Sequence, residues 1–253
     1  MGRGTDRDRY RPAAPAVHQL MTPMPPNNNE RTGHMTIDAH SPLHYQAYLL
    51  AYDLGKLDLY DRTRTAFLVR AAVLVELALQ GSLSDRDGDA VRTGSGAAGD
   101  PVLDQALDAV GERTRSWKSW LRHDYKRTLE AVEDRLADAG QLTIVKRRLL
   151  LVPKTRIRLA DPAAAKALQD HLCDVLQGTE PTANIAPRDA ALLVLARAGS
   201  VPSVTARINI HAFEERIDDL VNTVEQAAPG LGTMLRGTRT TMIAAQGGMG
   251  GSG

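Results

Sequence analysis

The stretch LVRAAVLVELALQGSL, residues 68–83, decides the fold class of this chain. Its apolar residues occupy nearly every side of a helix, which is typical of a helix that runs through a protein core. Between residues 66 and 79 only Arg70 and Glu76 interrupt the apolar run. The run is too short to cross a bilayer, which takes about 20 predominantly apolar residues. We therefore expect a buried helix over residues 62–80, ended by Gly81.

Helix signals also occur on both sides of this segment. The Asp-Pro pairs at residues 100–101 and 161–162 each supply an N-cap followed by proline at the first helical position. The polar, Gly-rich stretch 84–99 is expected to be an exposed loop. Together these patterns predict an all-α, mostly helical single domain with a small β-hairpin. Besides 62–80, the expected helices cover residues 44–52, 100–110, 117–139, 161–178, 190–198 and 208–227.

Composition divides the 253 residues into three parts. Residues 1–40 are rich in Arg and Pro and poor in large apolar side chains, so we expect a disordered N-terminal arm. Residues 41–245 have ordinary globular character and form the expected helical domain. Residues 246–253 are a Gly-rich tail.

A basic segment follows the expected helix 117–139. The sequence QLTIVKRRLLLV, residues 141–152, predicts a hairpin whose strands, 142–145 and 149–152, flank a basic tip. This region could be an anion-binding surface, or its charges could simply protect a strand edge from other chains. Both interpretations stay open at this point. The cations, with no acid among them, are Lys146, Arg147, Arg148, Lys154, Arg156 and Arg158.

Motifs of catalysis are missing from the sequence. It contains no GxSxG, GxxxxGK[ST], GxGxxG or HExxH, and Cys173 is the single cysteine, so neither a disulfide nor a cysteine-ligated zinc site can form. We expect no catalytic residues, no metal and no cofactor, and a reducing, cytoplasmic compartment. Glu76, inside the apolar helix, needs a partner. A structural pair with a neighbouring helix is favoured over a general base.

Several segments, in this order, resemble the Golgi phosphoprotein 3 family. They are the core helix 68–83, GDPVLDQALDAV at residues 99–110, the helix with QLT, LLLV and a return strand over residues 122–159, and PRDAALLVLARAGSV at residues 187–201. The resemblance spans about residues 45–224, and the collinear order makes it more specific than any one motif. The abundance of Ala, Asp and Arg suits a bacterial member.

The resemblance implies a largely helical domain that binds phosphatidylinositol 4-phosphate in a basic pocket, with a hairpin that contributes to membrane contact and self-association. Arg70 and Lys126 match two basic pocket positions. Asp61 replaces the family's aromatic residue and Leu129 its second arginine, so weaker and less selective binding is expected. The candidate headgroup residues are Arg70, Lys126, Arg127, Tyr60 and Asp61. The candidate hairpin residues are Lys146, Arg147, Arg148, Arg156 and Arg158.

Each of the two matched cations also has a purely structural interpretation. Arg70 could be the buried partner of a carboxylate such as Glu76 or Asp53. Lys126 could be an ordinary solvated cation on a helix. The sequence leaves both alternatives open.

Three functions compete on these patterns. The favoured one is a peripheral membrane protein that binds an anionic, phosphoinositide-like lipid. A winged-helix-like nucleic-acid-binding protein is the alternative, since a helix followed by a basic hairpin also suits that class. It is disfavoured because the expected helix 117–139 carries acids that would repel a phosphate backbone. The third is an adaptor that recruits protein partners, which the sequence does not identify, through its Arg-rich arm.

Overall fold

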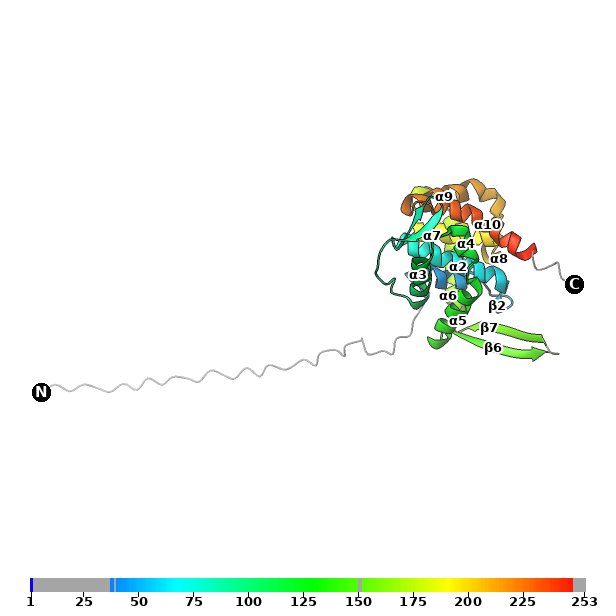
Figure 1. Ribbon diagram of the computed structural model, residues 1–253. Coiled ribbons are helices and arrows are strands. Elements are labelled where there is room, and N and C mark those ends of the chain that lie inside the picture. The colour runs from blue at the N-terminus through cyan, green and yellow to red at the C-terminus, as the bar shows by residue number, and fades with distance from the viewer. Residues whose placement is uncertain (2–36, 39, 150–151, 248–253) are drawn as a thin grey trace. The chain divides into compact units, whose positions relative to one another are not determined.

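The computed structural model describes residues 1, 37–38, 40–149 and 152–247 (Figure 1). Apart from Met1, the described residues belong to one compact unit. Their α-helices are α1 Leu43–Leu50, α2 Arg62–Leu79, α3 Pro101–Glu112, α4 Trp117–Arg122, α5 Tyr125–Asp138, α6 Pro162–Gln177, α7 Pro187–Gly199, α8 Pro202–Thr205, α9 Glu214–Ala227 and α10 Leu231–Gly247. Their strands are β1 Tyr52–Asp53, β2 Asp58–Leu59, β3 Leu83–Arg86, β4 Asp89–Arg92, β5 Arg115–Ser116, β6 Leu142–Leu149 and β7 Val152–Leu159.

Helix α2 runs through the centre of the unit, as its sequence predicts (Figure 1). Fourteen of its 18 residues are buried, because its apolar side chains point in all directions. All eight residues of α1 and the last ten of α7 are buried as well, and both helices pack on α2. Gly81 follows α2 with φ of +71°, a left-handed conformation that glycine adopts without strain. The three helices form the hydrophobic core.

Amphipathic helices cover this core. Helices α3, α5, α6 and α9 each bury one face and leave the opposite face to solvent. The two Asp-Pro pairs start α3 and α6 as expected: Asp100 accepts hydrogen bonds from the backbone N–H groups of Val102 and Leu103, and Asp161 accepts one from that of Ala163. The mostly helical fold with small β elements is thereby confirmed.

The described part of the chain contains three small antiparallel sheets, more β-structure than predicted. Strands β3 and β4 pair with Leu83 opposite Arg92, so the expectation of an exposed loop over residues 84–99 was wrong for residues 84–92. The fully buried Ala90 joins that hairpin to the hydrophobic core, a contact that the polar, Gly-rich composition concealed. The other sheets are β1–β2 and β6–β7.

The β6–β7 hairpin exists but is longer than predicted. Its register pairs Leu142 with Leu159 and Leu149 with Val152, so residues 150–151, outside the described residues, connect the strands. The prediction that Lys146, Arg147 and Arg148 form the tip was therefore wrong, because all three belong to strand β6. The ladder continues through the cations because β7 supplies a paired residue for each of them, with Thr155 opposite Lys146 and Lys154 opposite Arg147.

Two helical expectations also need correction. Residues 117–139 form two helices, α4 and α5, separated at Asp124, whose φ of 55° is left-handed. The second difference is α10, which the sequence did not predict and which packs on α7, α9 and α4. Its many Gly and Thr residues have low helix propensity, so tertiary packing stabilises it. The expected disorder of the N-terminal arm falls almost entirely on residues 2–36, outside the described residues, and stays a prediction.

Candidate functional site

Arg70 lies in the middle of α2 with only 3% of its surface exposed. Its Nε donates a hydrogen bond to the Trp120 carbonyl at 3.1 Å, and its Nη1 donates to Thr128 Oγ1 at 3.4 Å. Its Nη2 is buried and has no hydrogen-bond partner in the described part of the protein. Burial lowers the pKa of the guanidinium to about 10, so Arg70 still carries its charge at neutral pH. A buried cation thus has one donor group unsatisfied.

The charge of Arg70 is only partly neutralised by its surroundings, because Asp124 acts on it electrostatically but forms no ion pair with it. Within the described residues no carboxylate forms an ion pair with Arg70, and Trp120 has a buried Nε1–H that likewise finds no acceptor. The guanidinium of Arg115 lies 5.1 Å from the centre of the Trp120 ring. Buried donors without acceptors cost free energy, of order 1–3 kcal/mol each, unless a ligand or water accepts their hydrogen bonds.

His123 lies next to Trp120, and its pKa depends on the charges of the nearby arginines. Its ring stacks edge-on against Trp120, with centroids 5.2 Å apart. Burial lowers the pKa of His123, and the nearby Arg115, Arg70 and Arg113 lower it further, although Asp124 acts in the opposite direction. His123 Nδ1 lies 3.2 Å from Asp124 Oδ2, a contact close enough for an ion pair but not aligned as a hydrogen bond. The surroundings of His123 thus disfavour a further positive charge.

Helix α5 begins directly after His123 and Asp124. Asp124 precedes its first turn in a left-handed conformation, and its side chain forms no capping hydrogen bond with described residues. The free N–H groups of a helix N-terminus carry about half a positive charge and attract anions. Thr128, the partner of Arg70 Nη1, lies in this first turn. The unsatisfied donors of Arg70 and Trp120, their cationic neighbours and the start of α5 form what we call the Arg70 cluster.

A small cleft of about 130 Å³ lies next to it, between α2 and α5. Lys126 lines this cleft with Arg62, Ala66 and Glu130. Ala66 precedes Arg70 by one helical turn, so the cleft and the Arg70 cluster follow the same row of α2. Arg62 is held by Glu133, with Nη1 2.7 Å from Oε1. Lys126 forms no ion pair with the described residues, and its ammonium lies 5.8 Å from the centre of the Tyr125 ring.

The other predicted headgroup residues lie elsewhere. The Tyr60 hydroxyl donates to the Gly199 carbonyl at 3.1 Å, and its side chain lines a different pocket. Asp61 is the N-cap of α2 and accepts a hydrogen bond from the Arg64 N–H at 2.7 Å. Arg127 is exposed on α5. The structure thus brings Arg70 and Lys126 to one helix pair and does not gather all five residues in one pocket.

The suggested carboxylate partners of Arg70 pair with other residues. Glu76 Oε1 lies 2.8 Å from Arg188 Nη1 of α7, and its Oε2 accepts a hydrogen bond from the Leu43 N–H at 2.7 Å. Asp53 Oδ2 lies 3.1 Å from the ammonium of Lys56. The interpretation of Arg70 as partner of Glu76 or Asp53 was therefore wrong, while the structural pair predicted for Glu76 is confirmed.

Sequence reasoning missed the contributions of Trp120, His123 and Arg115. A signal was present: Asp124 stands before an amphipathic run at the position that an N-cap occupies, which indicates a new helix start.

Of the predicted hairpin residues, Arg156 and Arg158 are exposed on β7, two residues apart and hence on one face of the strand.

Within the described residues, no helix combines the length and apolarity that a membrane span requires. Nor does that part of the chain contain a group of three or more His, Cys, Asp or Glu side chains placed to hold a metal ion.

Comparison with known proteins identifies the family. The model of the Golgi phosphoprotein 3 (GPP34) family matches residues 43–237, which include α1 to α9 and the beginning of α10. Among curated proteins, no sequence matches this chain. The matched range includes both the Arg70 cluster and the β6–β7 hairpin. The chain therefore belongs to the Golgi phosphoprotein 3 family.

Proposed function

We propose that this protein is a non-catalytic, peripheral membrane protein that binds the phosphate of an anionic lipid headgroup at the Arg70 cluster. The observation that carries the proposal is the buried Nη2 of Arg70, which has no acceptor among the described residues although the side chain is charged. A phosphate oxygen can accept hydrogen bonds from a guanidinium and from a helix N-terminus, and such charge-assisted bonds are stronger than neutral ones. Family membership supports phosphatidylinositol 4-phosphate as the headgroup.

Lys126 and the hairpin play secondary roles in this proposal. Lys126 supplies a point charge at the rim of the cleft. The cations of β6 and β7 add attraction to any anionic surface, at about 1 kcal/mol for each cation close to it. Self-association through the hairpin, which the family resemblance also implies, belongs to the proposal as well and can be measured by analytical ultracentrifugation.

The nucleic-acid alternative has little support. Helix α5, the candidate recognition helix, exposes Glu130, Asp134 and Asp138 at four-residue intervals. These acids form a negative stripe along the helix, which would repel a phosphate backbone. A DNA-shift assay on the same preparation tests this alternative directly.

The decisive experiment is flotation of the full chain with phosphatidylcholine liposomes doped with phosphatidylinositol 4-phosphate or, at equal total charge, with phosphatidylserine. We expect stronger flotation with the phosphoinositide. Arg70→Met should remove the difference, whereas Arg86→Met, which removes an exposed arginine of β3, should preserve it. Equal flotation with both lipids for the unaltered protein would contradict headgroup recognition and leave only nonspecific attraction.

A further inference from the structure

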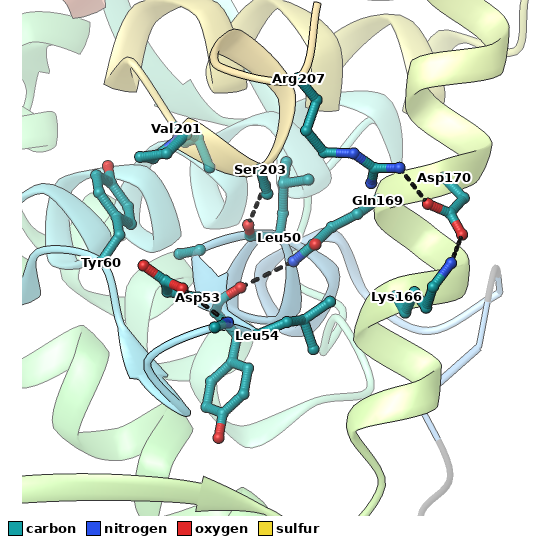
Figure 2. A pocket seen from close by; sticks show the side chains of 14 residues that line it. Leu50, Asp53, Leu54, Tyr60, Lys166, Gln169, Asp170, Val201, Ser203 and Arg207 are labelled. Carbon is teal, nitrogen blue, oxygen red and sulfur yellow. Dashed lines mark hydrogen bonds and ion pairs between the residues drawn. The ribbon is translucent and has the colours of Figure 1, made fainter.

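A second pocket, of about 280 Å³, lies between the end of α1, strand β1, helix α6 and helix α8. Figure 2 shows its side chains. Its volume corresponds to roughly nine water molecules at about 30 Å³ each, so it suits a small polar molecule and not a nucleotide. None of the residues that form the Arg70 cluster lines it.

One wall of this pocket is cationic and held in place by a carboxylate. Asp170 Oδ2 lies 2.5 Å from Lys166 Nζ, and Asp170 Oδ1 lies 2.6 Å from Arg207 Nη2. Two cations share one carboxylate, so the group has a net charge of +1 at neutral pH. Most of the N–H donors of an ammonium and a guanidinium remain available after one bond each. The wall therefore offers several charged donors to an anion.

The opposite side of the pocket offers acceptors. Gln169, only 2% exposed, donates its Nε2 to the carbonyls of Leu49 at 3.2 Å and Tyr52 at 2.9 Å. These two bonds use both N–H groups of the amide and fix its orientation. Its Oε1 accepts no hydrogen bond from the described residues and is available to a ligand. Asp53 lies across the pocket from the cations, on the far side of Gln169 (Figure 2).

The carboxylate of Asp53 is only partly occupied. Its Oδ1 accepts hydrogen bonds from the N–H groups of Gly55 and Lys56, which fixes the turn. Its Oδ2 contacts the ammonium of Lys56, whose side chain is 72% exposed. An exposed pair of this kind contributes little, typically 0–1 kcal/mol, so a ligand ammonium can replace Lys56 at small cost.

We propose that this pocket binds a small zwitterion in which a phosphate and a primary ammonium are separated by a short carbon chain, as in O-phosphoethanolamine. The phosphate accepts from Lys166 and Arg207, and the ammonium donates to Gln169 Oε1 and Asp53. Opposite charges on opposite sides of a pocket of this size favour a ligand with separated charges over a simple anion or a simple amine. The site is distinct from the Arg70 cluster and does not depend on it.

The test is isothermal titration of the full chain with O-phosphoethanolamine, inorganic phosphate and ethanolamine. We expect saturable one-to-one binding of O-phosphoethanolamine, at least about tenfold tighter than that of either fragment. Lys166→Met should weaken it about tenfold, because a charged hydrogen bond is lost. Lys118→Met, which removes an exposed lysine of α4, is the matched control and should leave the affinity for O-phosphoethanolamine unchanged.

A second variant tests the ammonium end. Asn keeps the turn-forming oxygen of residue 53, so Asp53→Asn should fold normally. The variant should lower the affinity for O-phosphoethanolamine about tenfold and leave the affinity for inorganic phosphate unchanged. The proposal is overturned if inorganic phosphate binds as tightly as O-phosphoethanolamine, or if Asp53→Asn lowers the affinity for neither ligand. It is also overturned if Lys118→Met lowers the affinity for O-phosphoethanolamine as much as Lys166→Met does.

Vesicles distinguish the two sources of this chemistry. If the ligand is a lipid headgroup, phosphatidylethanolamine should increase flotation over phosphatidylcholine, and Asp53→Asn should abolish the increase. If the ligand is a free metabolite, the two vesicles should behave alike while O-phosphoethanolamine still binds in solution. Both results support the zwitterion site. Arg70→Met should leave the titration unchanged, which separates a failure of this site from a failure at the Arg70 cluster.

Discussion

Arg70 brings a charge into the protein interior at a position where an apolar residue would pack more favourably. Taking a charged group out of water costs free energy, and within the described residues no acid forms an ion pair with Arg70, so that Asp124 offsets only part of the cost through its nearby charge. Its two hydrogen-bond acceptors also have other partners: the Trp120 carbonyl accepts from the His123 N–H at 3.2 Å, and Thr128 Oγ1 donates to the Asp124 carbonyl at 3.0 Å. Folding therefore gains little from this arginine, which is consistent with a role in binding.

This imbalance predicts that Arg70→Met separates stability from binding. Met fills a similar length of space, and both former acceptors keep a hydrogen bond, because the Trp120 carbonyl still accepts from the His123 N–H and the Thr128 hydroxyl still donates to the Asp124 carbonyl. We expect the melting temperature to stay constant or to rise by roughly 2–4 °C, which corresponds to about 1 kcal/mol in a domain of this size. Differential scanning fluorimetry measures this shift, and a fall of many degrees would identify Arg70 as a structural residue.

Asp124 provides a second prediction at a single residue. Its carboxylate is the acid that most directly opposes the positive charge of the cluster. Asn tolerates the left-handed conformation that this position requires, so Asp124→Asn removes the charge without straining the backbone. Affinity for anionic liposomes should rise roughly two- to fivefold, as expected for loss of one exposed repulsive charge. Unchanged affinity in the flotation assay would place the anion elsewhere.

The helices show where local sequence patterns are sufficient. Helices α2, α3 and α6 begin and end close to their predicted positions because their caps are local: Asp100 and Asp161 each reach the backbone of the next turn. The division between α4 and α5 could not be found from periodicity, since apolar spacing continues across the break. It depends on a single left-handed residue, Asp124. The candidate site could be predicted only in part for the same reason, because its geometry depends on that break.

The β6–β7 hairpin supports a prediction about charge alone. Lys146, Arg147 and Arg148 lie within β6, so their replacement by Ser does not alter the connection between the strands. We expect the triple variant to bind phosphoinositide and phosphatidylserine liposomes more weakly by the same factor, because charges on a surface strand act mainly through a screened field. Flotation over a range of salt concentrations measures the effect. Selective loss for one lipid would show that this strand contributes to a specific site.

At the scale of the whole molecule, function depends on contacts between segments that are far apart in sequence. Arg70 meets Trp120 and Thr128 more than 40 residues later, and the pocket with Gln169 collects residues from α1 to beyond α8. Composition and periodicity could predict the core helix, the mostly helical fold and the basic hairpin. They could not predict which cation would lack an acceptor, since that depends on how the helices pack.

Glu76 offers a prediction about the cohesion of the whole domain. Its carboxylate, 3% exposed, joins three central helices: it lies in α2, accepts from the first N–H of α1 and pairs with Arg188 of α7. Glu76→Ala leaves Arg188 partly buried without its acid, and breaking a buried pair in this way typically costs about 3–5 kcal/mol. We expect a loss of this size in the free energy of unfolding, measured with urea.

The double variant decides whether the loss comes from the stranded charge or from the pair itself. Arg188 also donates from its Nη2 to the Ser41 carbonyl at 2.6 Å, so Arg188→Met removes one bond besides the pair. If a stranded charge is the main cost, adding Arg188→Met to Glu76→Ala should restore part of the stability, and the double variant should be more stable than Glu76→Ala alone. Strictly additive losses would instead mean that the two residues stabilise the domain independently. In that case the hydrogen bond from the Leu43 N–H, which is lost in Glu76→Ala and in the double variant, is the main contribution of Glu76 to stability. Helix α1 is then the helix that depends on Glu76 most.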